Sequence, residues 1–99
     1  MRSQINELNG VLTATLSDSL TFADHGLFRK LLEDVQASTC LQCVFNLSEL
    51  KLIDSSGLGM MMIAIEESKK NGWKLSVADA NGPVLQLLQL SRLDKLLMQ

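Results

Sequence analysis

The order of apolar patterns along the chain is the feature that most constrains its fold. Leu12, Ala14 and Leu16 alternate with Val11, Thr13 and Thr15, which is the period of a β-strand. Asn9-Gly10 just before them is a strong signal for a two-residue hairpin turn. A strand over residues 4–8 is therefore expected to pair antiparallel with residues 11–16. After this hairpin the patterns alternate between helix and strand, which indicates a mainly parallel sheet with one antiparallel edge, joined by right-handed crossovers.

The expected helices and strands carry recognisable start and stop signals. Thr21 followed by Asp24 has the spacing of a capping box, which predicts a helix that ends near Gln36. A second helix, from Ser55, is expected to end at Asn71-Gly72, a good C-cap. The apolar stripe of the first helix is expected to consist of Leu27, Phe28, Leu31, Leu32 and Val35. The other expected elements are strands over residues 41–47, covered on both faces, and 73–78, and helices that open at Pro83 and Ser91.

The composition is that of one ordinary globular domain over residues 1–99. Apolar residues make up 46% and charged residues 20% of the chain, which is enough for a core without disulfides or metal. The net charge is −2 and no basic block is longer than Lys69-Lys70, which argues against nucleic-acid binding through a basic surface. No segment has the pattern of a signal peptide or approaches the roughly 18 apolar residues of a membrane span, so we expect a cytoplasmic protein.

Cys40 and Cys43 form a Cys-x-x-Cys pattern, which raises redox or metal chemistry as hypotheses. A reactive Cys-x-x-Cys follows a strand and opens a helix, whereas this pair leads into the apolar strand at Val44 and Phe45. A zinc site would need two further ligands, and the chain has a single histidine. We therefore expect both cysteines to be packing residues, with no metal ion or cofactor bound.

The segment most informative about function is the one in which apolar residues run into Asp54-Ser55-Ser56-Gly57 and a helix pattern begins. The first N–H groups of a helix lack intrahelical partners and carry the positive end of the helix dipole. Asp54, Ser55 or Ser56 can therefore cap this end, and a phosphate would be stabilised there. The alternative interpretation is an ordinary helix start, in which Gly57 and Gly59 allow close packing.

Catalysis by this segment is not expected. Residues 48–56 should form a loop after a strand that ends near Asn46, at the carboxyl edge of the sheet where functional loops gather. An enzyme with Ser55 or Ser56 as nucleophile would need a base, and the only histidine, His25, falls in the first helix. The chain offers a phosphate acceptor and lacks the motifs of a phosphate donor.

The second helix carries the hypothesis of a binding partner. Met60 and Ile63 lie off its expected core stripe, where methionine next to Ser55 would suit an adaptable binding surface. Packing of these two side chains against a neighbouring helix remains equally open. The expected core stripe, at positions i, i+3, i+4 and i+7, is Leu58, Met61, Met62 and Ile65.

The run Asp54-Ser55-Ser56-Gly57-Leu58-Gly59 after an apolar strand resembles the signature of the STAS domain (sulfate transporter and anti-sigma factor antagonist), in particular that of the small stand-alone antagonists. The resemblance extends from the Asn9-Gly10 hairpin to the closing helix at residues 93–96. It implies an α/β fold, with a mixed four- to five-stranded sheet, an N-terminal antiparallel hairpin and about four flanking helices. In this family the first serine after the aspartate is phosphorylated. That serine corresponds to Ser55, which leaves Ser56 mainly as a capping residue.

The resemblance also implies a bacterial partner-switching pathway. The unphosphorylated antagonist would bind a serine kinase and anti-sigma factor with a histidine-kinase-like ATPase fold, phosphorylation of Ser55 would end the binding, and a metal-dependent phosphatase would restore it. The alternative is a STAS interaction subunit of a membrane-associated complex, such as a lipid-transport complex, without phosphorylation. The residues expected to contact a partner are Asp54, Ser55, Ser56, Gly57, Gly59, Met60 and Ile63.

Overall fold

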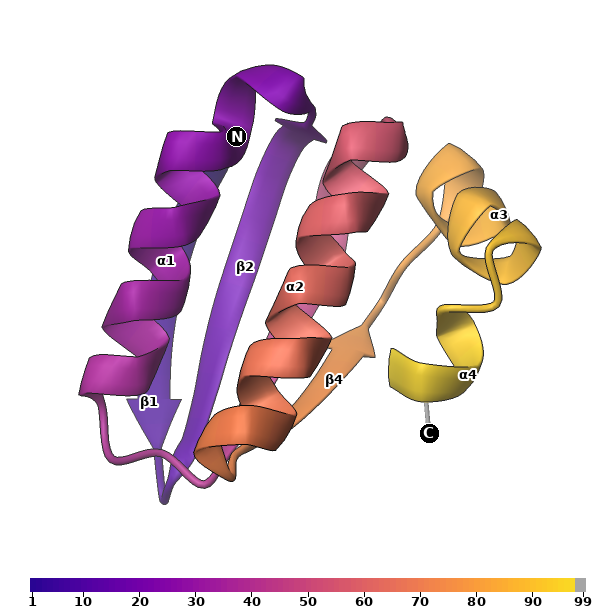
Figure 1. Cartoon of the computed structure of the whole chain (residues 1–99). Helices are drawn as coiled ribbons and strands as arrows, with labels where there is room; N and C mark the ends of the chain where they lie inside the picture. The colour runs from indigo at the N-terminus through magenta and orange to yellow at the C-terminus, as the bar shows by residue number, and fades with distance from the viewer. Residues whose placement is uncertain (98–99) are drawn as a thin grey trace.

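The computed structural model, which describes residues 1–97, is a mixed β-sheet covered by helices. Its elements are β1 (Arg2–Leu8), β2 (Val11–Leu20), the 3-10 turn η1 (Phe22–Asp24), α1 (His25–Ala37), β3 (Gln42–Ile53), α2 (Ser55–Asn71), β4 (Lys74–Ala78), α3 (Gly82–Leu90) and α4 (Asp94–Leu97). The strand order is β1-β2-β3-β4, with β1 antiparallel to β2 and the other neighbours parallel, which confirms the expected four-stranded form of the fold. Figure 1 shows α1 and α2 side by side on one face, with α3 and α4 beyond β4. None of the described helices is long and apolar enough to cross a membrane.

The core lies between the sheet and its helices. Side chains on the face beneath α1 and α2 are fully buried, including Leu16 of β2 and Phe45 of β3. The Phe45 ring contacts Phe28 of α1 edge to face, with 5.9 Å between the ring centroids. Alternate residues such as Thr13 and Val44 are only half-buried because they point to the opposite face. The expectation that β3 is covered on both faces is therefore wrong.

Two glycine-containing turns form as expected. Asn9 and Gly10 both adopt left-handed backbone conformations, with φ of 54° and 81°, which is what a tight hairpin turn between twisted strands requires. Gly72 also has a positive φ, of 80°, and its N–H donates to the Ser68 carbonyl oxygen at 2.9 Å. This C-cap ends α2 at the position that the sequence predicts.

The start of α1 confirms the predicted capping box. The Thr21 N–H donates to Asp24 Oδ2 at 2.8 Å across the single turn of η1, and α1 follows directly. Leu27 is exposed, contrary to the expected stripe, and it is not among the α1 residues that line the groove toward α2. The buried stripe of α1 is Phe28, Leu31, Leu32 and Val35.

The largest difference from the sequence-based expectation is the length of β2 and β3. They run to Leu20 and Ile53 rather than to residues 16 and 46. Two register shifts in the β2–β3 pairing break the alternation of side chains, so the strand period is lost over this polar stretch of the sequence. Residues 48–53 are therefore strand instead of loop, and Asp54 alone separates β3 from α2.

Both cysteines of the Cys-x-x-Cys pattern are free thiols buried in the core. Burial of Cys43, assisted by the neighbouring Cys40, raises the pKa of its thiol to about 12, so the reactive thiolate does not form at neutral pH. Cys40 Sγ lies 3.9 Å from the Val35 carbonyl oxygen at the end of α1. Cys43 thus packs as a small apolar side chain, as predicted.

Dithiothreitol and EDTA are each expected to leave the melting temperature almost unchanged, because two buried free thiols act through packing. Thermal unfolding followed by circular dichroism, with and without each reagent, measures this. Cys43→Ser is the positive control: a hydroxyl in an apolar core should lower the free energy of unfolding by about 1–3 kcal/mol. A marked fall in melting temperature with either reagent would reveal a metal ion or disulfide that stabilises the fold.

Candidate functional site

Asp54 connects the start of α2 to the end of β2 and the start of η1. Its Oδ1 accepts a hydrogen bond from the Gly57 N–H at 2.8 Å, which makes it the N-cap of α2. Its Oδ2 accepts from the Phe22 N–H at 3.2 Å, and its own N–H donates to the Leu20 carbonyl oxygen at 3.3 Å. Of the three residues that could cap α2, Asp54 is the one that does.

Ser55 is the first residue of α2 and its side chain is exposed, as the sequence predicts. Ser56 is half-buried. Within residues 1–97 neither hydroxyl forms a hydrogen bond, so the expectation that Ser56 serves as a capping residue is wrong, because Asp54 already satisfies the helix terminus. Ser55 therefore presents a free hydroxyl at the positive end of a helix dipole.

Gly57 and Gly59 differ in their surroundings although both were expected to allow close packing. A Cβ atom at Gly57 would overlap the Leu20 carbonyl oxygen and lie 2.6 Å from Ile53 Cγ1, so no larger residue fits without movement. A Cβ atom at Gly59 would meet no atom within 4 Å. Gly57 is thus required by the contact between α2 and the end of the β2–β3 pair, whereas Gly59 leaves open space at the helix surface.

The close approach at Gly57 sets which side of α2 is buried. Met60 is only 2% exposed, whereas Met62 and Ile63 are 52% and 48% exposed. Met60 therefore does not present a side chain to a partner, and Met62, expected in the core, lies at the surface instead. Counting i+3, i+4, i+7, i+8 and i+11 from Gly57 gives the observed buried set, Met60, Met61, Ala64, Ile65 and Ser68.

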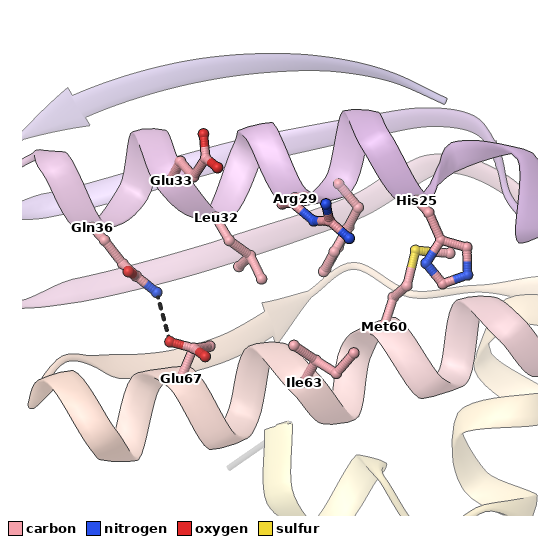
Figure 2. Close-up of a pocket in the computed structure, with 9 residues that line it drawn as sticks. His25, Arg29, Leu32, Glu33, Gln36, Met60, Ile63 and Glu67 are labelled. Atoms are coloured by element: carbon pink, nitrogen blue, oxygen red, sulfur yellow. Dashed lines mark hydrogen bonds between the residues drawn. The ribbon is translucent and has the colours of Figure 1, made fainter.

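A groove of about 350 Å³ runs between α1 and α2 (Figure 2). His25 and Arg29 lie toward the end where both helices begin, and a hydrogen bond of 3.0 Å from Gln36 Nε2 to Glu67 Oε2 spans the groove at the other end. Within residues 1–97, Arg29 forms no ion pair, although Glu33 and Glu67 also line the groove. The apolar lining is Phe28, Leu32, Met60 and Ile63.

Phe22 is a surface residue beside this site that the sequence patterns do not single out. It is 73% exposed, its backbone N–H is held by the Asp54 carboxylate, and its ring meets His25 edge to face with centroids 5.4 Å apart. The bond to Asp54 joins residues that are 32 positions apart, which no local pattern reveals. An aromatic side chain held at the surface in this way is typical of a contact residue for a protein partner.

The described residues contain no arrangement that would make Ser55 a nucleophile. The His25 ring contacts Phe22 and its nitrogens form no hydrogen bond within residues 1–97, so no serine–histidine pair is assembled. The same residues hold no group of three or more histidine, cysteine, aspartate or glutamate side chains placed to bind a metal ion. The geometry supports a site that is recognised or modified by another protein.

Gly57→Ala is expected to lower the free energy of unfolding by about 1–3 kcal/mol, because the added methyl group must displace the end of β2 or Ile53. Gly59→Ala is the matched control in the same helix. It should raise stability by up to about 1 kcal/mol, because alanine favours the helix and nothing obstructs its methyl group. Urea unfolding of both variants measures the difference, and equal stability of the two would contradict the packing described at Gly57.

Comparison with known proteins places this geometry in a family. The sequence model of the STAS domain matches residues 2–98. The anti-sigma F factor antagonist of Paenibacillus polymyxa is 30% identical over 98 residues, which cover 98% of this chain and 84% of that protein. An anti-sigma factor antagonist from Mycobacterium paratuberculosis has the same fold, with a TM-score of 0.79 and 20% identity over 97% of this chain and 81% of that one. The Bacillus cell fate determinant SpoIIAA in its phosphorylated form matches with a TM-score of 0.68 and 18% identity, over 98% of this chain and 89% of that one. The chain therefore belongs to the STAS domain family.

Proposed function

We propose that the chain is an anti-sigma factor antagonist that works by partner switching in the cytoplasm. In its unphosphorylated form it binds a serine kinase with a histidine-kinase-like ATPase fold, and phosphorylation of Ser55 ends this binding. The observation that carries the proposal is the free, exposed hydroxyl of Ser55 at the N-terminus of α2, next to a carboxylate cap. The identity of 30% with an anti-sigma F factor antagonist supports the same function.

The surface that meets the kinase follows the outward side of α2. Ser55, Gly59, Met62 and Ile63 recur at i, i+4, i+7 and i+8, which places them on one side of the helix, opposite the side packed on the sheet. We call these four residues together with Phe22 the docking face. Gly57 and Met60 are buried beneath the docking face, where they hold α2 in place. Asp54 and Ser56 lie at the rim of the docking face. Exposed methionine, isoleucine and phenylalanine side chains around a neutral hydroxyl suit a largely apolar contact.

A phosphate on Ser55 changes the charge of this surface more than its shape. It adds about −1.5 to −2 charges and three acceptor oxygens. The Asp54 carboxylate next to it is already engaged with the Gly57 and Phe22 N–H groups, so the phosphate adds its charge beside an existing negative charge. A partner that fits a neutral hydroxyl must then desolvate and face that charge, which weakens binding. Hydrolysis by a metal-dependent serine phosphatase restores the neutral surface.

Incubation with the cognate kinase and ATP is expected to add one phosphate to the wild type and none to Ser55→Ala, while Ser56→Ala is still modified. Intact-mass spectrometry measures this directly. Ser55→Ala should retain kinase binding because a small neutral side chain causes no repulsion, whereas Ser55→Asp should bind more weakly. Modification that persists in Ser55→Ala and disappears in Ser56→Ala would move the switch by one residue.

Gly59→Ala tests whether the kinase contacts the outward side of α2. The added methyl group meets nothing within the chain, so the variant should fold at least as well as the wild type but bind the kinase at least several-fold more weakly. Gly26→Ala, in α1, is the control, since a Cβ atom there also meets nothing within 4 Å. Isothermal titration calorimetry with both variants gives the comparison, and equal affinities would exclude Gly59 from the interface.

A further inference from the structure

Strand β1 forms an open edge of the sheet that nothing in the described chain covers. All seven of its residues are exposed, and within residues 1–97 it pairs only with β2. Exposed edges are usually protected by proline, by a bulge or by a central charge. The pairing of β1 with β2 is regular over all seven residues, and the charged residues Arg2 and Glu7 lie toward its two ends. The outer edge of β1 is therefore free to accept another strand.

Apolar side chains lie beside this open edge. Ile5, at the middle of β1, is exposed and shares its face of the sheet with Ala14, which is buried beneath the helices. Leu27 is exposed on α1 and does not line the groove toward α2, and α1 lies over the β1 side of the sheet (Figure 1). Leu27 is the residue of the expected α1 stripe that remains exposed. Ile5 and Leu27 therefore leave apolar surface exposed next to the open edge of β1.

We infer that a second copy of this chain pairs with β1 in antiparallel register, so that the two sheets become continuous. With Ile5 opposite Ile5 of the second copy, Ser3 lies opposite Glu7, Gln4 opposite Asn6 and Arg2 opposite Leu8, and no like charges meet. The two-fold axis also sets the two α1 helices antiparallel on the same face, where Leu27 loses exposure. A pairing about one axis closes on itself and leaves no open β1 edge for further association.

The flank of α1 is compatible with this arrangement. Lys30 Nζ and Asp34 Oδ1 form an ion pair of 3.1 Å within α1, so this helix carries both signs of charge. In an antiparallel pair of α1 helices, Lys30 of one copy could instead pair with Asp34 of the other. One seven-residue edge and part of a helix form an interface at the small end of those seen in stable dimers. We therefore expect a weak, reversible dimer. It leaves α2 and Ser55 exposed and does not depend on the proposed function.

Sedimentation equilibrium of the purified chain tests the pairing. The apparent mass should rise from one chain of 10.9 kDa toward twice that value as concentration increases from micromolar to millimolar. Ile5→Lys places two cations opposite each other at the axis and should weaken association about tenfold or more. Leu90→Lys, at an 80% exposed leucine at the end of α3, is the matched control and should not affect it. A monomer at every concentration, or a dimer insensitive to Ile5→Lys, would overturn the proposal.

Cysteine cross-linking gives the register independently of the effect of Ile5→Lys on folding. Directly opposed residues of antiparallel strands have Cα atoms about 4.5–5.5 Å apart, within reach of a disulfide. Under mild oxidation, Ile5→Cys should form linked dimers much faster than Ser3→Cys, which faces residue 7 of the second copy. Cys40 and Cys43 are buried and should contribute little background. Equal rates for the two variants, or a faster Ser3→Cys, would contradict the pairing about Ile5.

Discussion

The two-sided hydrogen bonding of the Asp54 carboxylate is the interaction on which the site depends. One oxygen satisfies the Gly57 N–H at the start of α2, and the other holds the Phe22 N–H at the start of η1. A neutral or shorter side chain could not satisfy two donors on different elements with the strength of a charge-assisted bond. Because Asp54 is the single residue between β3 and α2, this contact also fixes where the helix begins and hence which hydroxyl is presented to solvent.

The rotation of α2 about its own axis follows from a second constraint, the absence of a side chain at Gly57. The helix start can approach the Leu20 carbonyl oxygen and Ile53 only on that side, so the residues that follow at helical spacing are buried and those opposite are exposed. Two adjacent methionines illustrate the result: Met61 is fully buried and Met62 lies at the surface. The outward orientation of the docking face therefore follows from the close packing at Gly57.

How much of this could be predicted from the sequence depends on the range of each interaction. The Asn9-Gly10 turn, the Thr21–Asp24 capping box and the end of α2 are local, and the sequence predicts all three. The extension of β2 and β3 is not local, because register shifts between two strands remove the alternation that marks a strand. For the site, the position of Ser55 follows from the capping motif, whereas the roles of Phe22 and Met62 depend on contacts between elements. The burial of α2 would have been predicted correctly by counting from Gly57 instead of Leu58.

The two interaction surfaces that we propose, the docking face and the edge of β1, lie on different elements, and this separation has a physical basis. α1 lies over the β1 side of the sheet with α2 beside it (Figure 1), and Phe28 and the other buried residues of α1 anchor it to the sheet. A charge added at Ser55 acts within about one Debye length in physiological salt, which is roughly 8 Å, and the charges nearest to it belong to Asp54 and the helix terminus. The proposed pairing of β1 with a second copy rests on backbone hydrogen bonds along seven residues and on Ile5, neither of which a screened surface charge perturbs strongly. If both proposals hold, modification of Ser55 changes recognition at the docking face, while the pairing of β1 remains governed by concentration alone.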